Sequence, residues 1–209
     1  ARFLTLNING LRDQNKHLSF LQWLSQLSVD FVCLQETHVS SESECSSWFS
    51  SFGFLSLASP GSVHSCGTVL LYCPRFTLCN SSCDAAGRFI CAEFSYNDIS
   101  FHVVSLYAPN RNPDRDAFLQ FVSERVDPGS PTIICGDFNT VFDRARDRRG
   151  FAPASAPRDS SGALSSLFKE CCVVDVWRHL HPHSSAFTWL RPDGSFSSRI
   201  DLVGCPLPW

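Results

Sequence analysis

Short apolar segments that alternate with amphipathic ones constrain the fold of this 209-residue chain more than any other feature. Apolar runs, alternating or continuous, predict strands at about 2–8, 31–35, 52–58, 67–73, 88–95, 99–107, 132–135, 173–177, 186–190 and 198–204. Apolar residues at helical spacing predict helices at about 16–28, 114–126 and 159–171. Hairpin and crossover connections are mixed, so we expect an α/β fold of two mixed β-sheets packed together and flanked by helices.

For several segments the sequence allows more detailed predictions. The first helix is expected to present a wide apolar face made of Leu18, Phe20, Leu21, Trp23, Leu24 and Leu27. The second helix is expected to begin with Asp114 as its N-cap and to turn inward Phe118, Phe121 and Val122. The Ser-rich stretch 40–51 indicates an exposed segment, and 143–158 indicates a long loop. No linker or repeat divides the chain, so we expect residues 1–209 to form a single domain.

Charge and hydropathy narrow the classes of partner. Seventeen Lys and Arg against twenty Asp and Glu give a net charge of −3, which excludes a surface that binds nucleic acid over its whole extent. A local phosphate contact is compatible with four crowded arginines, Arg144, Arg146, Arg148 and Arg149. No apolar run approaches the roughly 18 residues that cross a bilayer, and the first strand carries no secretory signal. We therefore expect no membrane partner.

The eleven cysteines favour a reducing compartment. Their number is odd, and several lie within apolar runs, as do Cys33, Cys73, Cys91 and Cys135. These thiols are expected to be small buried apolar groups rather than disulfides. No Cys-x-x-Cys occurs, so structural zinc is not expected.

Polar residues follow apolar strands at several places along the chain, where a sheet presents side chains to a cleft. They are Asn7, Glu36, Tyr107, Asp137, Asn139 and Asp201. Each of them alone has an ordinary explanation as a strand-end or turn residue. Together they suit phosphodiester cleavage, which needs a hard cation on carboxylate oxygen, a base for water and hydrogen-bond donors around phosphorus.

The residue chemistry assigns roles only in part. Glu36 can hold Mg²⁺, and Asp137 can accept a proton from water or help to seat the ion. Asn7, Asn139 and the Tyr107 hydroxyl can hydrogen-bond phosphoryl oxygens or position neighbouring carboxylates. No residue pattern for serine acyl transfer or for a nucleotide-binding glycine loop occurs. The spacing of three histidines at 179, 181 and 183 around Pro182 favours an exposed turn over a metal site.

At these residues the sequence resembles a known family. Five ordered motifs resemble those of the endonuclease/exonuclease/phosphatase superfamily, and most closely those of the endonuclease domain of LINE-type, non-LTR retrotransposons. They are Leu6-Asn7-Ile8-Asn9-Gly10-Leu11, Cys33-Leu34-Gln35-Glu36-Thr37-His38, Leu106-Tyr107-Ala108-Pro109-Asn110, Gly136-Asp137-Phe138-Asn139-Thr140 and Ser198-Arg199-Ile200-Asp201. The resemblance extends over nearly the whole chain, from its first residues to about residue 204.

The resemblance implies a four-layered α/β sandwich with a cleft at one edge of its two sheets. It also implies a Mg²⁺-dependent nick, with Mn²⁺ as a possible substitute, that leaves a 3′-hydroxyl to prime reverse transcription. Within the family, residues matching Glu36 and Asn7 bind the metal, and those matching Asp137 and Asn139 position or activate the nucleophile. Residues matching Tyr107 and Asn110 contact the phosphate.

Asp201 acquires its role only from the resemblance. In the family the matching residue orients a histidine of a Ser-Asp-His motif on the last strand, and no such motif precedes Trp209. We expect the sequence to stop short of this strand, because the five upstream motifs are intact; the alternative is a degenerate element that has lost the motif. None of the seven histidines replaces the missing one.

Target choice is expected to depend on loops around the cleft. Residues 188–198 predict a hairpin that turns at 192–194, and related endonucleases insert a hairpin at this position into the minor groove. Thr188, Ser198 and Arg148 match polar family residues that contact DNA. Alternatively, this is an ordinary surface hairpin and the Arg-rich segment a solvated loop.

Three further interpretations stay open at this point. The chain is alternatively an apurinic/apyrimidinic repair endonuclease, a phosphoesterase acting on a small or lipid phosphate, or an inert DNA-binding module. For the retrotransposon interpretation we expect double-stranded DNA and a downstream reverse transcriptase domain as partners, and a monomeric domain. We expect synthesis in the cytoplasm and action in the nucleus.

Overall fold

A computed structural model describes residues 1–150 and 159–207 of the chain. The chain divides into two compact units, Ala1–Tyr107 and Ala108–Trp209, which we describe separately. The prediction of a single domain over residues 1–209 stays a prediction.

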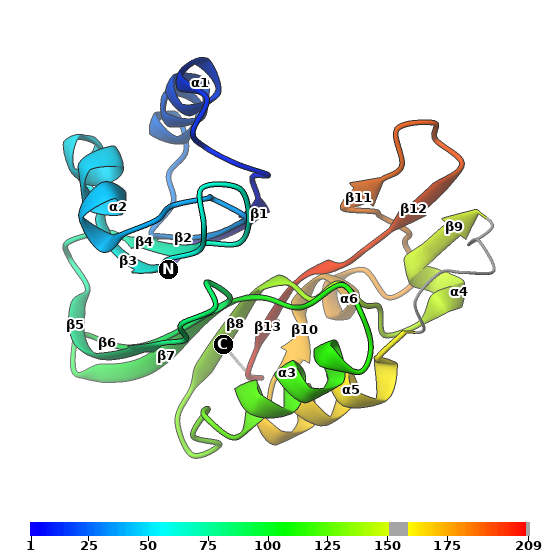
Figure 1. The fold of residues 1–209 in the computed structure, drawn as a ribbon. Coiled ribbons are helices and arrows are strands. Elements are labelled where there is room, and N and C mark those ends of the chain that lie inside the picture. The colour runs from blue at the N-terminus through cyan, green and yellow to red at the C-terminus, as the bar shows by residue number, and fades with distance from the viewer. Residues whose placement is uncertain (151–158, 208–209) are drawn as a thin grey trace. The chain divides into compact units, whose positions relative to one another are not determined.

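The first unit is organised by a mixed four-stranded sheet (Figure 1). Its order is β1 (Phe3–Asn7), β2 (Phe31–Gln35), β4 (Thr68–Tyr72) and β3 (Leu55–Ser59). β1 and β2 are parallel, with Asn7 opposite Gln35, and β4 is antiparallel to both β2 and β3. β2 and β4 are buried along their whole length, which explains their continuously apolar sequences.

Two helices bury one face of this sheet. They are α1 (Gln14–Ser25) and α2 (Glu42–Phe49), and a short 3-10 turn, η1 (Ser50–Phe52), follows α2. The shared core consists of Leu11, Phe20, Leu21, Leu24, Val32, Leu34, Val39, Cys45, Phe49, Ala58, Val69 and Leu71. Val32 and Leu34 alternate with Cys33 and Gln35, so one strand serves both faces of the sheet.

Aromatic side chains fill the opposite side. An antiparallel meander of β5 (Thr77–Cys83), β6 (Phe89–Tyr96) and β7 (Ile99–Tyr107) completes the unit. The Phe31 ring packs edge-on against Phe94 and Phe101, at centroid distances of 5.0 and 5.9 Å. These contacts tie the buried strand β2 to the meander, so β7 ends at a fixed place beside its own unit's core.

The second unit is built around three antiparallel strands and two packed helices. The strands are β10 (Val174–Asp175), β13 (Asp201–Cys205) and β8 (Thr132–Asp137), with β13 in the middle. α3 (Asp114–Ser123) packs beside α5 (Ser161–Glu170), as Figure 1 shows. α6 (Val176–Leu180) follows β10 directly and contacts β13.

A small separate sheet extends from this unit. It consists of β11 (Trp189–Leu190), β12 (Phe196–Ser198) and β9 (Arg148–Gly150), with β12 in the middle. A short helix, α4 (Arg144–Asp147), leads into β9. In Figure 1 the connection between β11 and β12 extends beyond the ends of these two strands.

Two expectations for the first unit are wrong. The stretch 40–51 is not simply exposed but contains α2, which buries Cys45 and Phe49. Ser41 is the N-cap of this helix and accepts from the backbone N–H of Glu44, while the Glu44 carboxylate accepts from the backbone N–H of Ser40. The apolar face of α1 is narrower than expected, since Leu18 and Trp23 are 57% and 42% exposed.

Other boundaries differ because local patterns conceal them. The strand β5 escapes prediction, since it is polar and mostly exposed on both faces. Asp114 is the first helical residue and not the N-cap of α3, a position that Pro113 occupies. Phe118 and Phe121 are only half-buried and stack on each other, whereas Leu119 and Val122 are buried.

The segment expected as a loop at 143–158 contains α4 and β9, and its residues 151–158 lie outside the described part of the chain. The expected strand at 173–177 ends at Asp175, where α6 begins. Asp175 caps this helix by accepting from the backbone N–H of Arg178 at 3.1 Å. A side chain that caps a helix therefore ends the strand early.

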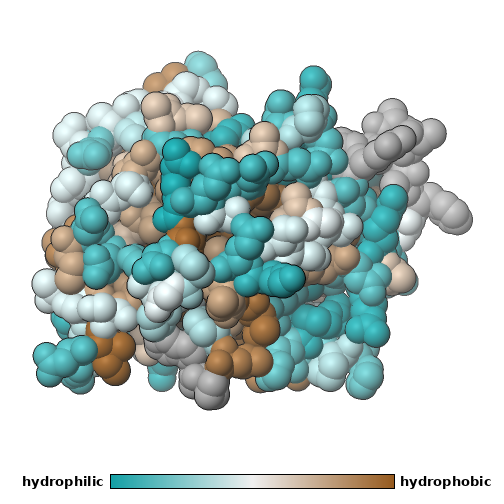
Figure 2. Space-filling view, turned by 90° about the horizontal axis from the view of Figure 1, so that it is seen from below, coloured by the Kyte–Doolittle hydropathy of each residue, from teal (hydrophilic) through white to brown (hydrophobic). Residues whose placement is uncertain are grey.

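The surface carries its hydrophobic residues in small groups. Figure 2 shows these groups among hydrophilic residues on the face that it draws.

The predicted burial of the cysteines is confirmed only in part. Cys33 and Cys135 are buried as expected, while Cys73 and Cys91 are only half-buried. Burial raises the pKa of the Cys91 thiol to about 11. Among the described residues, no helix has the length and apolar character needed to cross a membrane.

Two glycines give a matched test of the small sheet. Gly150 has φ +93, and a Cβ there would lie 2.0 Å from the carbonyl oxygen of Ser195 in the facing chain. Gly150→Ala should therefore lower the free energy of unfolding by about 1–3 kcal/mol and weaken β9–β12 pairing. Gly162 in α5 has open space around its Cα, so Gly162→Ala should raise it by about 0.5–1 kcal/mol. Urea unfolding of both variants checks this, and equal stability of the two contradicts the β9–β12 register.

Candidate active site

In the first unit, Asn7 and Glu36 lie together at the ends of two parallel strands. The side-chain amide of Asn7 donates to Oε1 of Glu36 at 2.8 Å. The backbone N–H of Asn9 donates in turn to Oδ1 of Asn7 at 3.1 Å. Both contacts follow from the parallel β1–β2 register, which places Asn7 opposite Gln35. The carboxylate of Glu36 is therefore held in one orientation.

The backbone around Glu36 is strained. Asn9, Glu36 and His38 have φ of 48°, 53° and 60°, in the left-handed region that residues other than glycine seldom adopt. Backbone hydrogen bonds hold the two loops together, from Gly10 to the carbonyl of Glu36 and from Leu11 to that of Thr37. Strain of this kind persists only where surrounding contacts enforce it, and it concentrates at functional sites.

Tyr107 closes the first unit at the end of β7 and is 6% exposed. Its backbone N–H donates to the carbonyl of Arg88 at 2.8 Å, and Nη1 of Arg88 donates back to the carbonyl of Tyr107 at 3.1 Å. The Arg88 guanidinium lies 4.7 Å from the centre of the Tyr107 ring. A cation on the ring face and two backbone bonds fix the ring.

In the second unit, the acidic residues Asp137 and Asp201 lie opposite each other. β8 ends with Asp137, and β13 begins with Asp201, its partner in the antiparallel register. The prediction that Asp201 ends a strand is therefore wrong. Because β13 is antiparallel to β8, its first residue, Asp201, lies at the same end of the sheet as the last residue of β8, Asp137.

Asn139 is fixed through three of its polar groups. Its backbone N–H donates to Oδ1 of Asp137 at 2.9 Å, and its side-chain amide donates to the carbonyl of Ala108 at 2.8 Å. Its own carbonyl accepts from Nη1 of Arg115 at 3.0 Å. The φ of Asn139 is 50°, so a second predicted site residue also has a strained backbone.

Asp201 combines burial with an unsatisfied oxygen. Its Oδ1 is buried and has no hydrogen-bond partner within the described residues. Burial raises the pKa of this carboxyl, and hydrogen bonding to Thr188 opposes that rise. Thr188 also holds the backbone at this corner, because its Oγ1 accepts from the N–H groups of Ile200 and Asp201, both at 3.1 Å.

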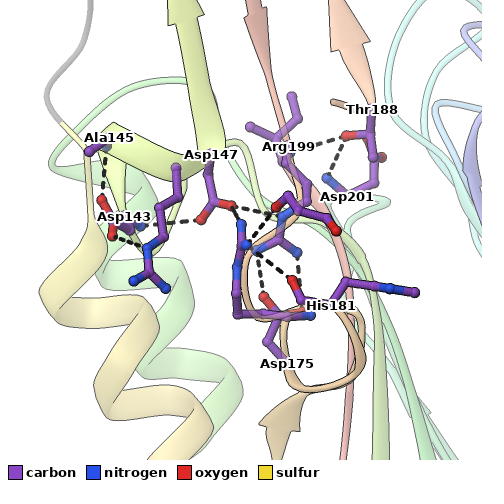
Figure 3. Close-up of polar contacts among 12 residues, drawn as sticks. Asp143, Ala145, Asp147, Asp175, His181, Thr188, Arg199 and Asp201 are labelled. Atoms are coloured by element: carbon purple, nitrogen blue, oxygen red, sulfur yellow. Dashed lines mark hydrogen bonds and ion pairs between the residues drawn. The ribbon is translucent and has the colours of Figure 1, made fainter. Parts of the chain in front are cut away.

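A buried ionic network supports this corner, as Figure 3 shows. Nε of Arg199 donates to Asp147 at 2.9 Å, and its two terminal nitrogens donate to Asp175 at 3.1 and 2.6 Å. Arg178 donates to the same Asp147 oxygen at 2.7 Å. The Arg199 and Asp147 side chains are 3% and 1% exposed. The indole of Trp177 lies 5.1 Å from the Arg199 guanidinium.

The predicted DNA contacts differ in exposure. Thr188 and Asn110 are exposed, whereas Ser198 is 3% exposed. The Arg148 side chain is 14% exposed and lies 2.5 Å from the carboxylate of Asp159. Exposure therefore favours Thr188 and Asn110 as contacts to a large ligand. The other three arginines of the Arg-rich segment, at 144, 146 and 149, are exposed.

The donor set at Glu36 fits a hard divalent cation. A carboxylate and a neighbouring amide are oxygen ligands of the kind that Mg²⁺ prefers, usually with one or two protein carboxylates and several waters. Within residues 1–150 and 159–207, no group of three or more His, Cys, Asp or Glu side chains could hold a metal ion. His179, His181 and His183 are exposed.

Two buried arginines escape prediction from the sequence. Arg115 is 2% exposed, and it lies on the same face of α3 as Leu119 and Val122. That helical spacing of a charged residue with apolar ones is the signal that could have identified it. Arg199 lies within a recognised motif, but its partners Asp147 and Asp175 are distant in sequence, and no local pattern indicates them.

Strained loops that carry carboxylate and amide side chains at strand ends are typical of functional sites. The model of the endonuclease/exonuclease/phosphatase family matches residues 4–203. The chain belongs to this family.

Two relatives make the comparison more specific. The chain is 34% identical, over 210 residues, to the transposon TX1 uncharacterized 149 kDa protein of Xenopus laevis. That alignment covers 95% of this chain and 15% of the transposon protein, so the chain spans a small part of its relative. It is 26% identical to an exodeoxyribonuclease of Bacillus subtilis, over 90% of this chain and 79% of that protein.

Solved structures share the fold. The catalytic domain of Xenopus laevis APE2 matches with a TM-score of 0.78 and 20% identity, covering 98% of this chain and 82% of that chain. An AP endonuclease from Archaeoglobus fulgidus matches with a TM-score of 0.75 and 21% identity, covering 96% and 85%. The predicted α/β class, two mixed β-sheets flanked by helices, is confirmed.

The ionic network gives a prediction for stability. Asp147→Asn should lower the free energy of unfolding by about 3–5 kcal/mol, because it leaves buried guanidinium groups without their shared anion. Asp143→Asn is the matched control, since the Asp143 side chain is 49% exposed and Asn caps a helix as well as Asp does.

The pH dependence has a definite sign. Hydrogen bonds from Arg199 and Arg178 lower the pKa of Asp147 against the opposing effect of burial. A lowered pKa stabilises the folded state fully above the ordinary Asp value of 3.8, and this contribution is lost as the pH falls through the lower folded value. The stability difference between wild type and Asp147→Asn should therefore shrink below about pH 4 in urea titrations. A difference that stays constant down to pH 2 contradicts the account.

Proposed function

We propose that this chain is a metal-dependent DNA endonuclease that nicks one strand of target DNA and leaves a 3′-hydroxyl to prime reverse transcription. The observation that carries the proposal is the 34% identity to a transposon protein over 95% of this chain. In the proposal, the chain belongs to a longer polyprotein with a downstream reverse transcriptase domain. It is made in the cytoplasm, acts in the nucleus and works as a monomeric domain on double-stranded DNA.

Glu36 and Asn7 are the proposed holders of the cation. Their hydrogen bond orients the Glu36 carboxylate before any ion binds, which lowers the cost of assembling the site. When bound, Mg²⁺ supplies positive charge to a phosphoryl oxygen and so favours attack on phosphorus. Mn²⁺ has the same preference for oxygen ligands and is a possible substitute.

The residues proposed to activate the attacking water lie in the second unit. Asp137 is the proposed acceptor of a proton from the attacking water, and Asn139 orients that water through its side-chain oxygen. The hydrogen bond from the Asn139 N–H to Asp137 couples the two side chains in one loop. Tyr107 and Asn110 are the proposed donors to phosphate oxygens, where charge develops during cleavage. Asp201 has a buried oxygen available to orient a further group, which in the family is a histidine.

The proposed DNA contacts are on the small sheet and its hairpin. The β11–β12 hairpin presents Thr188, Trp189 and Leu190 as exposed residues next to β9, which carries the exposed Arg149. An exposed two-stranded β-ribbon can enter a groove of duplex DNA. Arg148 and Ser198 are the weaker candidates for DNA contact, because the Arg148 side chain is 14% exposed and Ser198 is 3% exposed.

Nicking of supercoiled plasmid tests the proposal. Glu36→Gln should reduce the rate of nicking by about 100-fold or more and raise the Mg²⁺ concentration needed, because a carboxylate ligand becomes neutral. Glu42→Gln, the same change at an exposed residue of α2, should keep the wild-type rate. EDTA should abolish nicking by the wild type. A Glu36→Gln variant that nicks normally excludes the metal role of Glu36.

Repair of abasic sites is the second candidate, since AP endonucleases are among the matching solved structures. The same enzyme preparation is given plasmid without abasic sites, a duplex with one abasic site, and inositol phosphates. The transposon function predicts nicking of intact plasmid. Cleavage confined to the abasic duplex supports repair, and phosphate release alone supports a phosphoesterase. Binding of duplex DNA without any cleavage supports an inert binding module.

Replacement of residues 190–196 tests the hairpin. The variant should nick a different set of sequences while its Mg²⁺ dependence stays the same, because the replaced residues lie outside the metal and nucleophile loops. Mapping of nick positions by sequencing measures the change. Replacement of the turn at 127–130, between α3 and β8, is the control and should leave the pattern intact. An unchanged pattern in the hairpin variant removes the hairpin from target choice.

A further inference from the structure

Arg115 occupies an unusual position for a charged side chain. It lies in the first turn of α3 and is 2% exposed, and its helix buries Leu119 and Val122 on the same face. Burial lowers the pKa of its guanidinium, partly offset by Asp159 and Asp116. A buried guanidinium loses its hydration, and an apolar side chain would pack here without that desolvation penalty. The contacts of the guanidinium must therefore explain why an arginine occupies this buried position.

One nitrogen of this guanidinium joins two separate loops. Nη1 donates to the carbonyl of Asn110 and to the carbonyl of Asn139, both at 3.0 Å. Nε donates to Oγ of Ser160 at 2.9 Å, which anchors the other side of the group. Ser160 is itself held, because its N–H donates to Thr140 at 2.8 Å and its hydroxyl to Asn112 at 2.6 Å.

The contacts of Asn139 show what this connection achieves. Its N–H, its carbonyl and its side-chain amide are all engaged, and its φ of 50° is strained. Among the described residues, none donates a hydrogen bond to its side-chain oxygen, which is thereby presented as an acceptor. Without a donor at its carbonyl, the strained loop would relax and turn this oxygen away.

We propose that Arg115 is a positioning residue for DNA cleavage, which fixes the Asn110 and Asn139 loops relative to each other. The inference rests on the proposed function, in which Asn110 contacts phosphate and Asn139 orients the nucleophile. Arg115 touches neither substrate nor metal in this account. It acts through backbone carbonyls, so its effect falls on the geometry of attack rather than on binding.

Arg115→Ala tests the proposal by its effect on turnover. The kcat of plasmid nicking should fall on the order of 100-fold, because a displacement of about 1 Å at a reacting group has this effect, while KM changes less than about threefold. Guanidinium ion at millimolar concentration should restore part of the lost rate by refilling the vacated site. Arg125→Ala, at an exposed arginine stacked on Phe121 of the same helix, should keep the wild-type rate.

Amide hydrogen exchange gives a readout that does not depend on activity. In Arg115→Ala, amides of residues 108–112 and 137–141 should exchange at least about tenfold faster, while those of β13 stay protected. If Arg115→Ala fails to fold, Ser160→Ala replaces it, because it removes the acceptor of Nε, together with the hydrogen bond to Asn112, and keeps the arginine that donates to the two loop carbonyls. It should lower kcat by about three- to tenfold with the same pattern of exchange.

The outcomes separate the two proposals. Wild-type protein that nicks no DNA overturns the proposed function, and with it a role for Arg115 in cleavage. A nicking wild type together with an Arg115→Ala variant of normal kcat overturns the positioning role alone. Lost activity without rescue by guanidinium, with exchange raised evenly across the second unit, shows a general structural role and overturns it as well.

Discussion

The order of the second unit depends on one buried guanidinium, that of Arg199. It binds Asp147, 52 residues earlier, and Asp175, 24 residues earlier, and so joins α4, the start of α6 and the corner between β12 and β13. No apolar contact has this directional requirement, because each hydrogen bond fixes both a distance and an angle. The hairpin and Asp201, on either side of Arg199, therefore take their positions from the same charge.

Strain and support occur together in this protein. Glu36 and Asn139 have left-handed backbones, and each lies in a loop held by several hydrogen bonds. In the first unit, backbone bonds between loops provide this support, whereas in the second a buried arginine provides it. A buried ion pair contributes little net stability, but removal of one partner is strongly destabilising, because the other charge stays buried without compensation. The second unit is therefore the more sensitive to single charge substitutions.

The sequence predicts the elements whose information is local. Asn7, Glu36 and Asp137 are identified because a polar residue ends or follows an apolar strand, and the structure places each of them there. The helix α2 is missed because its Ser-rich composition conceals the N-cap at Ser41, and β5 because it buries neither face. Asp201 is expected at the correct edge but at the wrong end of its strand, since antiparallel pairing with β8 is not visible locally. The partners of Arg115 and Arg199 lie too far along the chain for any periodicity to show them.

The register that places Asp201 opposite Asp137 also has a thermodynamic consequence. Burial raises the pKa of Asp201, so an ionised carboxylate at this position costs desolvation free energy that a neutral side chain would avoid. Selection for stability alone would replace one of the two with a neutral residue. The pair instead resembles the trade-off in which an enzyme keeps a destabilising arrangement because its chemistry requires it. This edge of the second unit is accordingly a place where the fold gives up stability to hold two acids side by side.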